Sequence, residues 1–190
     1  DTVQEEADWF AARALELEPY NAFVLGLCAH VQSTVNLAFV AGFEFAQRSI
    51  ELCPSNPVAW VSLGFAESHL GRPASGIQHA RKARRIAGSS PFRFHIDLLS
   101  CIVGVMSGDF DDARYFGDAS HALAPNLRAP LRFLAALYFH DNNEGTAETL
   151  LDRLKLLEPG FSIDMLRDPS YPSESLRKSK LLSHVPGRQW

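Results

Sequence analysis

The histidines and cysteines are the side chains of this sequence best suited to metal binding or nucleophilic chemistry, but their spacing offers no site for either. Two histidines four residues apart would place both rings on one helical face toward a shared ion, and no pair has that spacing. The seven histidines are His30, His69, His79, His95, His121, His140 and His184. Cys28, Cys53 and Cys101 form no CxxC pair, and their apolar helical context favours small buried thiols.

Three carboxylates, Asp109, Asp111 and Asp112, could hold a cation, but they fall in a predicted turn between two helices. Aspartate favours such turns, and it also stabilises the first turn of the following helix by capping and dipole attraction. The sequence contains no GxSxG elbow, P-loop, GxGxxG or HExxH motif. We therefore expect no catalytic residue, no metal and no cofactor, and we predict that the chain is not an enzyme.

The densest positive patch consists of Arg81, Lys82, Arg84 and Arg85. On a helix these side chains spread over more than half of the circumference, which is typical of a solvated outer face near a helix C-terminus. Docking on an acidic partner domain or on nucleic-acid phosphates is the alternative. The formal net charge of −4 argues against a general nucleic-acid surface.

The composition is that of an ordinary folded protein, with 46% hydrophobic and 21% charged residues among 190. The longest apolar runs, such as residues 98–106, are too short to span a bilayer, and the first residues lack the layout of a secretory signal. We expect a cytoplasmic protein without a membrane partner.

One pattern of small and aliphatic residues recurs five times and predicts the elements that carry these side chains. A small residue is followed by small or apolar residues four and seven positions later, an aliphatic residue ten later, and a proline or glycine twelve later. The copies begin at Ala7, Gly42, Gly76, Ala113 and Ala147, at intervals of 35, 34, 37 and 34 residues. These offsets share one stripe of a helix, and small side chains there let a neighbouring helix approach closely.

Another apolar segment precedes each later copy, most clearly at residues 57–70, so each repeat predicts two antiparallel helices. The period resembles that of the tetratricopeptide repeat. The residues that carry the resemblance are Trp60, Leu63, Gly64 and Ala83, then Gly108 to Ala113 with Pro125, then Leu131, Leu134, Ala135, Tyr138, Ala147 and Pro159. The resemblance implies an all-α fold, a right-handed superhelix of tetratricopeptide-like helix pairs with a C-terminal capping helix.

We expect repeats over residues 1–160 and a C-terminal extension over residues 161–190. The repeats are an incomplete first one at 1–20, followed by repeats at about 22–54, 57–88, 94–125 and 128–159. Because the first copy lacks its first helix, we expect a fragment of a longer protein whose N-terminal helix is open to self-association. In the extension, Ser173 is expected to cap a helix reaching to Val185 that covers the last repeat.

The concave side of such a superhelix is lined by the first helix of each pair. The residues predicted to point into this groove are Val61, Phe65, His69, Leu98, Ile102, Met106, Arg132, Ala136 and His140. Apolar walls with Arg132 and two histidines at the edges would suit a peptide that has an apolar anchor and an acid. The alternative is that several of these residues pack between adjacent repeats.

Several short segments resemble bacterial proteins in which such repeats follow a winged-helix transcriptional regulator domain or a class III adenylate cyclase domain. They are residues 26–31, 55–60, 81–86 and 154–161, with Gly64 and the Gly71 to Pro73 turn. The resemblance implies a non-catalytic, protein-binding regulatory module whose partners include an N-terminal output domain of the same longer chain, without direct nucleic-acid binding. The alternative is a constitutive assembly adaptor or co-chaperone that binds peptides in its groove.

Overall fold

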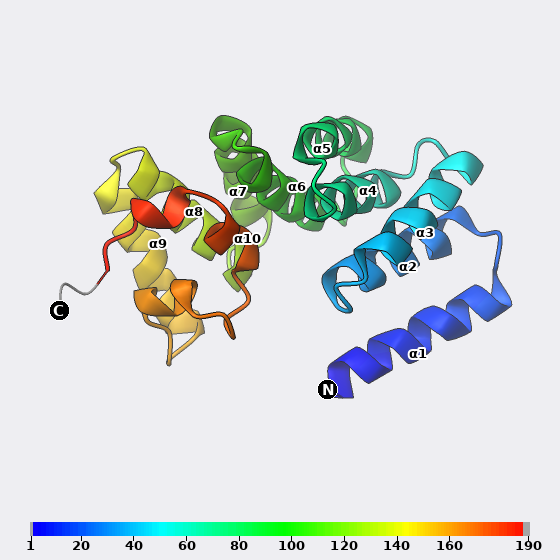
Figure 1. Cartoon of the computed structure of the whole chain (residues 1–190), viewed down its shortest axis with the longest axis horizontal. Coiled ribbons are helices and arrows are strands. Elements are labelled where there is room, and N and C mark those ends of the chain that lie inside the picture. The colour runs from blue at the N-terminus through cyan, green and yellow to red at the C-terminus, as the bar shows by residue number, and fades with distance from the viewer. Residues whose placement is uncertain (1, 188–190) are drawn as a thin grey trace.

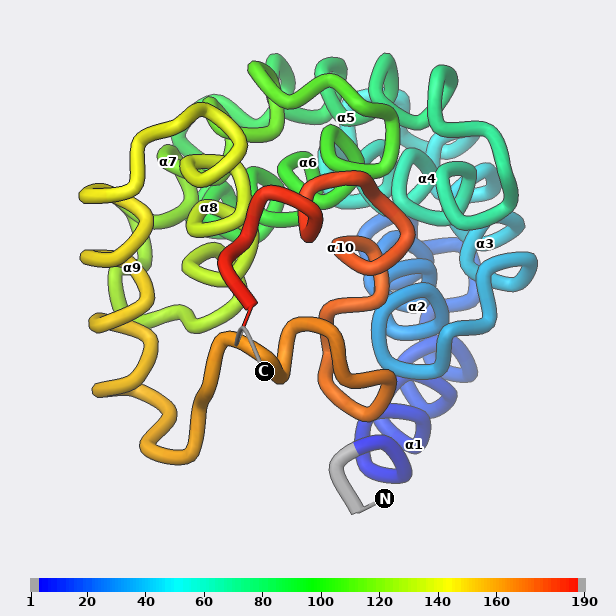
Figure 2. The backbone as a smooth tube through the Cα atoms, turned by 60° about the vertical axis from the view of Figure 1, so that its left-hand side comes forward, coloured from blue at the N-terminus to red at the C-terminus, as the bar shows by residue number. Residues whose placement is uncertain are grey.

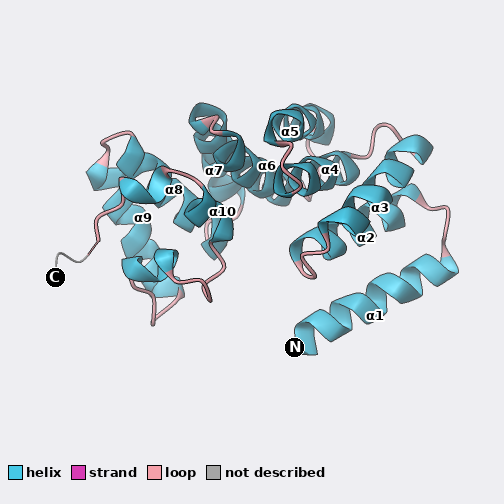
Figure 3. Cartoon of the chain, in the orientation of Figure 1, coloured by secondary structure: helices cyan, strands magenta, loops and turns pink. Residues whose placement is uncertain are grey.

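The computed structural model describes residues 2–187, with side chains from residue 4 onward, and within that part of the chain it contains helices and no strand (Figure 3). The long helices are α1 (Thr2–Leu17), α2 (Ala22–Thr34), α3 (Phe39–Leu52), α4 (Pro57–His69), α5 (Pro73–Ala87), α6 (Arg93–Ser107), α7 (Phe110–Leu123), α8 (Arg128–His140) and α9 (Glu144–Leu157). A C-terminal segment follows, with the 3-10 turns η1 (Ile163–Arg167) and η2 (Leu181–Ser183) on either side of α10 (Glu174–Lys178).

Helices α2 to α9 form four consecutive antiparallel pairs that stack into a curved array (Figure 1). The first helices of successive pairs, α2, α4, α6 and α8, also contact one another along the array. This arrangement confirms the all-helical fold that the repeat pattern predicts.

The helices of a pair approach closely because the facing residues are small. A Cβ atom added at Gly64 of α4 would lie 2.6 Å from the carbonyl oxygen of Gly76 in α5, and one added at Gly104 of α6 would lie 2.9 Å from the Cα atom of Ala113 in α7. Ala83, on the same stripe of α5 as Gly76, is fully buried. Larger side chains at these positions would push the helices apart.

Local signals explain several helix ends. The side chains of Asn21 and Asn56 accept hydrogen bonds from the first free N–H groups of α2 and α4. Gly108 ends α6 in the left-handed conformation, at a φ of 76° that suits glycine. The longer interval between the copies at Gly76 and Ala113 contains the loop of residues 88–92 between α5 and α6. Arg93 donates to the carbonyl oxygen of Gly88 in this loop at 2.9 Å.

Helix α1 packs on α2 through one face and leaves another face open. Ala11 lies on the packed face, where its carbonyl oxygen accepts a hydrogen bond from the Cys28 thiol at 3.6 Å. The small-residue stripe of α1 is therefore half-buried against α2 rather than bare. Trp9 and Phe10 are 62% and 64% exposed, with their ring centroids 4.9 Å apart.

The C-terminal segment differs from its expected form. The helix that begins after Ser173 ends at Lys178, well before Val185, and the Ser173 hydroxyl donates to the Leu166 carbonyl oxygen at 2.9 Å instead of capping the helix. Instead of covering the end of the stack, α10 contacts α6 and η2 contacts α8. Figure 2 shows the segment, in orange and red, inside the curve of the helices. Leu176 and Leu181 are fully buried, so this segment is an integral part of the core.

Candidate binding cavity on the concave face

A cavity of about 550 Å³ remains on the concave side, between the inner helices and the C-terminal segment. Its wall from the repeats consists of His30, Thr34, Val35, Leu37, Phe65, His69, His95, Leu98, Leu99, Ile102, Ala129, Arg132 and Phe133. The C-terminal segment contributes residues 169–175 and Arg177. The cavity is thus built from four repeats and closed on one side by a segment that the repeat pattern does not describe.

The structure brings five of the nine predicted groove residues to this cavity. They are Phe65, His69, Leu98, Ile102 and Arg132. Val61 and Ala136 are fully buried in the core, as the packing alternative expects. Met106 does not line the cavity, and His140 lies elsewhere, with its ring 4.8 Å from those of Phe110 and His184.

Sequence reasoning did not identify His30, Thr34 and His95 as cavity residues. A signal for the first two exists, because the capping residues Asn21 and Asn56 lie 35 positions apart. Counted from these caps, His30 of α2 corresponds to Phe65 of α4, and Thr34 corresponds to His69. The irregular junction after α2, where Leu37 adopts a φ of 54°, obscures this register in the sequence.

Two of the imidazoles contact each other across the cavity wall. His30 of α2 and His95 of α6 have ring centroids 4.5 Å apart, and the His95 Nε2 and His30 Nδ1 atoms are 3.5 Å apart. Burial and, to a smaller extent, the neighbouring His95 together lower the pKa of His30 to about 4. Burial also lowers the pKa of His95. Both rings are therefore neutral near neutral pH.

The third imidazole, His69 of α4, is held between two phenylalanine rings. It stacks on Phe39 at 4.2 Å between centroids and contacts Phe65 at 4.4 Å. Its Nδ1–H group donates to the Phe65 carbonyl oxygen at 3.0 Å. Burial lowers the pKa of His69, which also favours the neutral ring.

Arg132 reaches the cavity wall, but it does not offer a free charge to a ligand. Its Nη2 atom donates to Glu158 Oε2 at 2.9 Å, and its guanidinium lies 4.5 Å from the ring centroid of Tyr171. The Tyr171 hydroxyl donates to the same Glu158 oxygen at 3.1 Å. Burial would raise the pKa of Glu158, but the contacts with Arg132 and Tyr171 outweigh it and lower that pKa. Glu158 of this chain thus takes the place at Arg132 that the sequence predicts for an acidic group of the partner.

The basic run on α5 is largely engaged in contacts within the protein. Arg81 pairs with Asp112 at 2.6 Å and also with Asp109. The Lys82 ammonium lies 3.6 Å from the ring centroid of Trp60. The interpretation of the whole run as a solvated face is wrong for Arg84, whose side chain is 15% exposed and pairs with a buried carboxylate. Arg85 is exposed.

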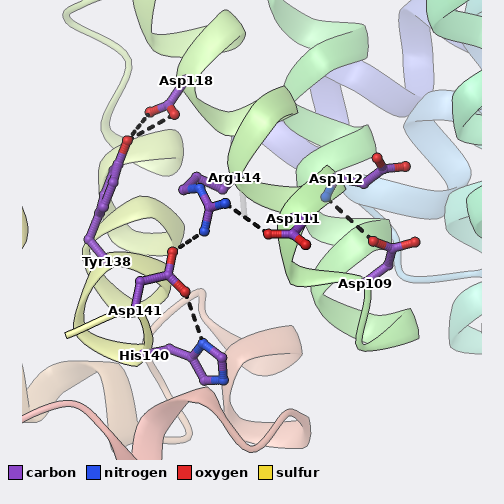
Figure 4. Close-up of polar contacts among 8 residues, drawn as sticks. All are labelled: Asp109, Asp111, Asp112, Arg114, Asp118, Tyr138, His140 and Asp141. Atoms are coloured by element: carbon purple, nitrogen blue, oxygen red, sulfur yellow. Dashed lines mark hydrogen bonds and ion pairs between the residues drawn. The ribbon is translucent and has the colours of Figure 1, made fainter. Parts of the chain in front are cut away.

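The acidic cluster has the turn and capping role that its position indicates (Figure 4). The Asp109 side chain accepts a hydrogen bond from the Asp112 N–H group at 3.4 Å, at the start of α7. Asp111 pairs with Arg114 at 2.8 Å, and Arg114 also pairs with Asp141 of the next repeat. Among the side chains that the structure describes, no group of three or more histidine, cysteine, aspartate or glutamate residues is placed to hold a metal ion.

A second polar contact in Figure 4 joins α7 to α8. The Tyr138 hydroxyl donates to both carboxylate oxygens of Asp118, at 3.1 and 2.9 Å. Burial and this carboxylate raise the pKa of Tyr138 to about 12, so the phenol stays protonated and holds the two helices together.

Between residues 2 and 187, no helix has both the length and the apolar character needed to cross a membrane.

No protein-family model matches the sequence, and neither does any curated protein. Solved structures do match. PilW, a widely conserved type IV pilus biogenesis factor, superposes with a TM-score of 0.66 at 17% identity, over 96% of this chain and 82% of that one. YrrB, a TPR protein with an unusual peptide-binding site, has a TM-score of 0.59 at 16% identity, over 86% and 82%. MamA from AMB-1 has a TM-score of 0.56 at 19% identity, over 89% and 100%. At these identities the likeness establishes the fold alone, and that fold is the tetratricopeptide-repeat superhelix.

Proposed function

We propose that this chain is a non-catalytic protein-binding module that receives a segment of a partner protein in its concave cavity. The observation that carries the proposal is the cavity itself, which has a volume of about 550 Å³ and an apolar wall of Phe65, Leu98 and Ile102 from two repeats. YrrB, which shares the fold, has a peptide-binding site. Stacked helix pairs offer such concave surfaces to extended or helical segments.

The finer form of the proposal is a regulatory module of a larger bacterial signalling or transcription-regulatory protein, acting in the cytoplasm on an output domain of the same longer chain. It depends on the segment resemblances noted in the sequence, such as residues 55–60 and 154–161. The alternative is a constitutive assembly adaptor or co-chaperone that uses the same cavity. The identity of the bound partner distinguishes these two functions.

Affinity capture with matched variants tests the proposal. Ile102→Glu places a charge in the cavity at a half-buried position. Leu156→Glu places the same charge on α9, at a side chain that is 74% exposed and does not line the cavity. The parent and the Leu156 variant should retain the same partner from bacterial lysate, and the Ile102 variant should lose it while keeping its helical content. Equal capture by both folded variants would contradict the proposal.

The open face of α1 supports a second contact, self-association through Trp9 and Phe10. Two adjacent aromatic side chains that are each more than half exposed present apolar surface that association would bury. This contact lies on α1, whereas the cavity lies between the inner helices of the four repeats and the C-terminal segment, so the two surfaces are separately testable.

A further inference from the structure

Two of the three charged side chains of the cavity lining have counter-charges within the protein. The three are Arg132, Glu174 and Arg177. Arg132 is paired with Glu158, and the Glu174 carboxylate forms an ion pair with the Lys178 ammonium at 2.6 Å. A ligand entering the cavity therefore meets an acid and a base that already have partners.

The Arg177 guanidinium donates hydrogen bonds within the C-terminal segment. Its Nη1 atom donates to the carbonyl oxygens of Asp168 and Tyr171 at 2.8 and 2.9 Å, and to the Ser173 hydroxyl at 2.8 Å. Its Nη2 atom donates to the Pro169 carbonyl oxygen at 3.3 Å. The guanidinium thus holds the loop before α10 in shape, and a ligand carboxylate would have to displace these bonds to reach it.

The histidines of the lining add hydrogen-bonding groups without charge. His30 and His95 contact each other, so charging either ring would place a cation against its neighbour. His69 lies between two phenylalanine rings, and the charged groups that act on it are the paired Lys178 and Glu174. These surroundings all favour neutral imidazoles.

The remaining surface is apolar with a few neutral polar atoms. Phe65, Leu98 and Ile102 supply the apolar wall, and Thr34 contributes a hydroxyl that already donates to the His30 carbonyl oxygen at 2.8 Å. The neutral imidazoles of His30 and His95 and the Thr34 hydroxyl can exchange hydrogen bonds with a neutral group such as an amide without adding a charge.

We propose that the cavity selects an uncharged, apolar anchor on the partner, an aromatic or large aliphatic side chain next to a neutral amide, and rejects a carboxylate or an ammonium group. The proposal rests on the proposed function and replaces the acidic anchor expected from the sequence. Its physical basis is that a charged ligand would lose its hydration here, while Arg132, Glu174 and Arg177 are already engaged by other groups of the protein. A neutral anchor meets no such cost.

Three probes that share one ring system test this selection. Indole-3-acetamide is neutral, indole-3-acetate is its anionic isostere, and tryptamine is a cationic relative. Each is titrated near neutral pH into the full chain, and the methyl resonances of Ile102 and Leu98 are followed by NMR. We expect saturable binding of the acetamide, with dissociation constants at least about tenfold higher for both charged probes, equivalent to about 1.4 kcal/mol.

Two variants test whether the NMR signal reports binding in the cavity. Ile102→Glu should abolish acetamide binding, whereas Leu156→Glu, on the outer face, should leave it unchanged. Binding of the acetate or tryptamine as tight as that of the acetamide would overturn the charge selection, and so would the absence of saturable acetamide binding. Either result leaves the proposed function standing if partner capture still depends on Ile102. Capture that ignores Ile102→Glu defeats the proposed function itself.

Discussion

Arg84 of α5 forms an ion pair with the fully buried carboxylate of Asp97 in α6, across the longest junction between two repeats. Arg93 supplies a second cation 3.6 Å from the same carboxylate. Burial raises the pKa of Asp97, and the two guanidinium groups oppose that effect. The pair thus fixes the geometry where the helix stack departs most from its regular period.

Replacing Arg84 with leucine should destabilise the protein strongly, because it removes the closer of the two cations that face a buried carboxylate and leaves only Arg93. Breaking a buried pair by removing one partner costs about 3–5 kcal/mol. Ala83→Leu, which overpacks the stripe between helices, should cost about 1–3 kcal/mol, and Arg85→Leu, at an exposed position, should stay within about 0.5 kcal/mol. Urea unfolding of the three variants measures this order. An Arg84 variant as stable as the Arg85 variant would show that the buried pair contributes nothing.

Replacing Arg132 with lysine should lower the melting temperature, because Arg132 is 8% exposed and contacts both Glu158 and Tyr171. Lysine cannot reproduce the planar contact with the ring. A hydrogen bond to a charged group contributes about 1.5–3 kcal/mol. Arg128→Lys is the matched control, since the Arg128 side chain is 55% exposed and lies 3.9 Å from the same carboxylate. Thermal unfolding measures both melting temperatures. An equal decrease in the two variants would argue against a structural role for Arg132.

The repeat architecture can be predicted from the sequence because the physical cause of the repeats is local. Gly64 and Gly76 lie where two neighbouring helices must nearly touch, and that need appears as a regular pattern along the chain. The pairs Arg84–Asp97 and Arg132–Glu158 depend on how one helix is rotated against another, which the pattern does not specify.

The return of the C-terminal segment to the concave face was also beyond sequence reasoning. Residues 161–173 have no helical period, and the contacts that hold them, such as Tyr171 on Arg132, join residues far apart in the chain. As a result, the sequence predicts that inner helices line a groove. It does not predict that Glu158 and Tyr171 contact Arg132 there.

Stability should fall as the pH drops from about 6.5 toward 4, in part through His30. Its folded pKa of about 4 lies below the unfolded value of about 6.5. The unfolded chain therefore binds more protons in this window, so the contribution of the neutral ring is fully present above about pH 6.5 and is lost on acidification. His30→Gln should flatten the dependence of the unfolding free energy on pH in this window, measured by urea titration at several pH values.

The exposed His184 provides the control for this effect. His184→Gln makes the same substitution at a ring that does not line the cavity, so a change of slope seen only in the His30 variant is due to the enclosed ring. A His30 variant with the same slope as the parent would mean that His30 is not kept neutral by burial.

Self-association through α1 should respond to a single charge. Phe10→Asp should abolish concentration-dependent association in sedimentation equilibrium, because it places a carboxylate in the apolar patch with Trp9. Leu156→Asp, at an apolar side chain on α9 that is also more than half exposed, should associate like the parent. A parent chain that stays monomeric at high concentration would contradict this contact.

Site-specific photo-crosslinking measures whether the concave cavity receives the partner. A benzophenone amino acid is placed at Ile102 in the cavity wall, or at Leu156 on the outer face of α9, and the cross-linked partner is identified by mass spectrometry. We predict an adduct from position 102 and none from position 156, with the attached partner peptide centred on an uncharged apolar residue. Adducts formed equally from both positions, or from position 156 alone, would contradict it.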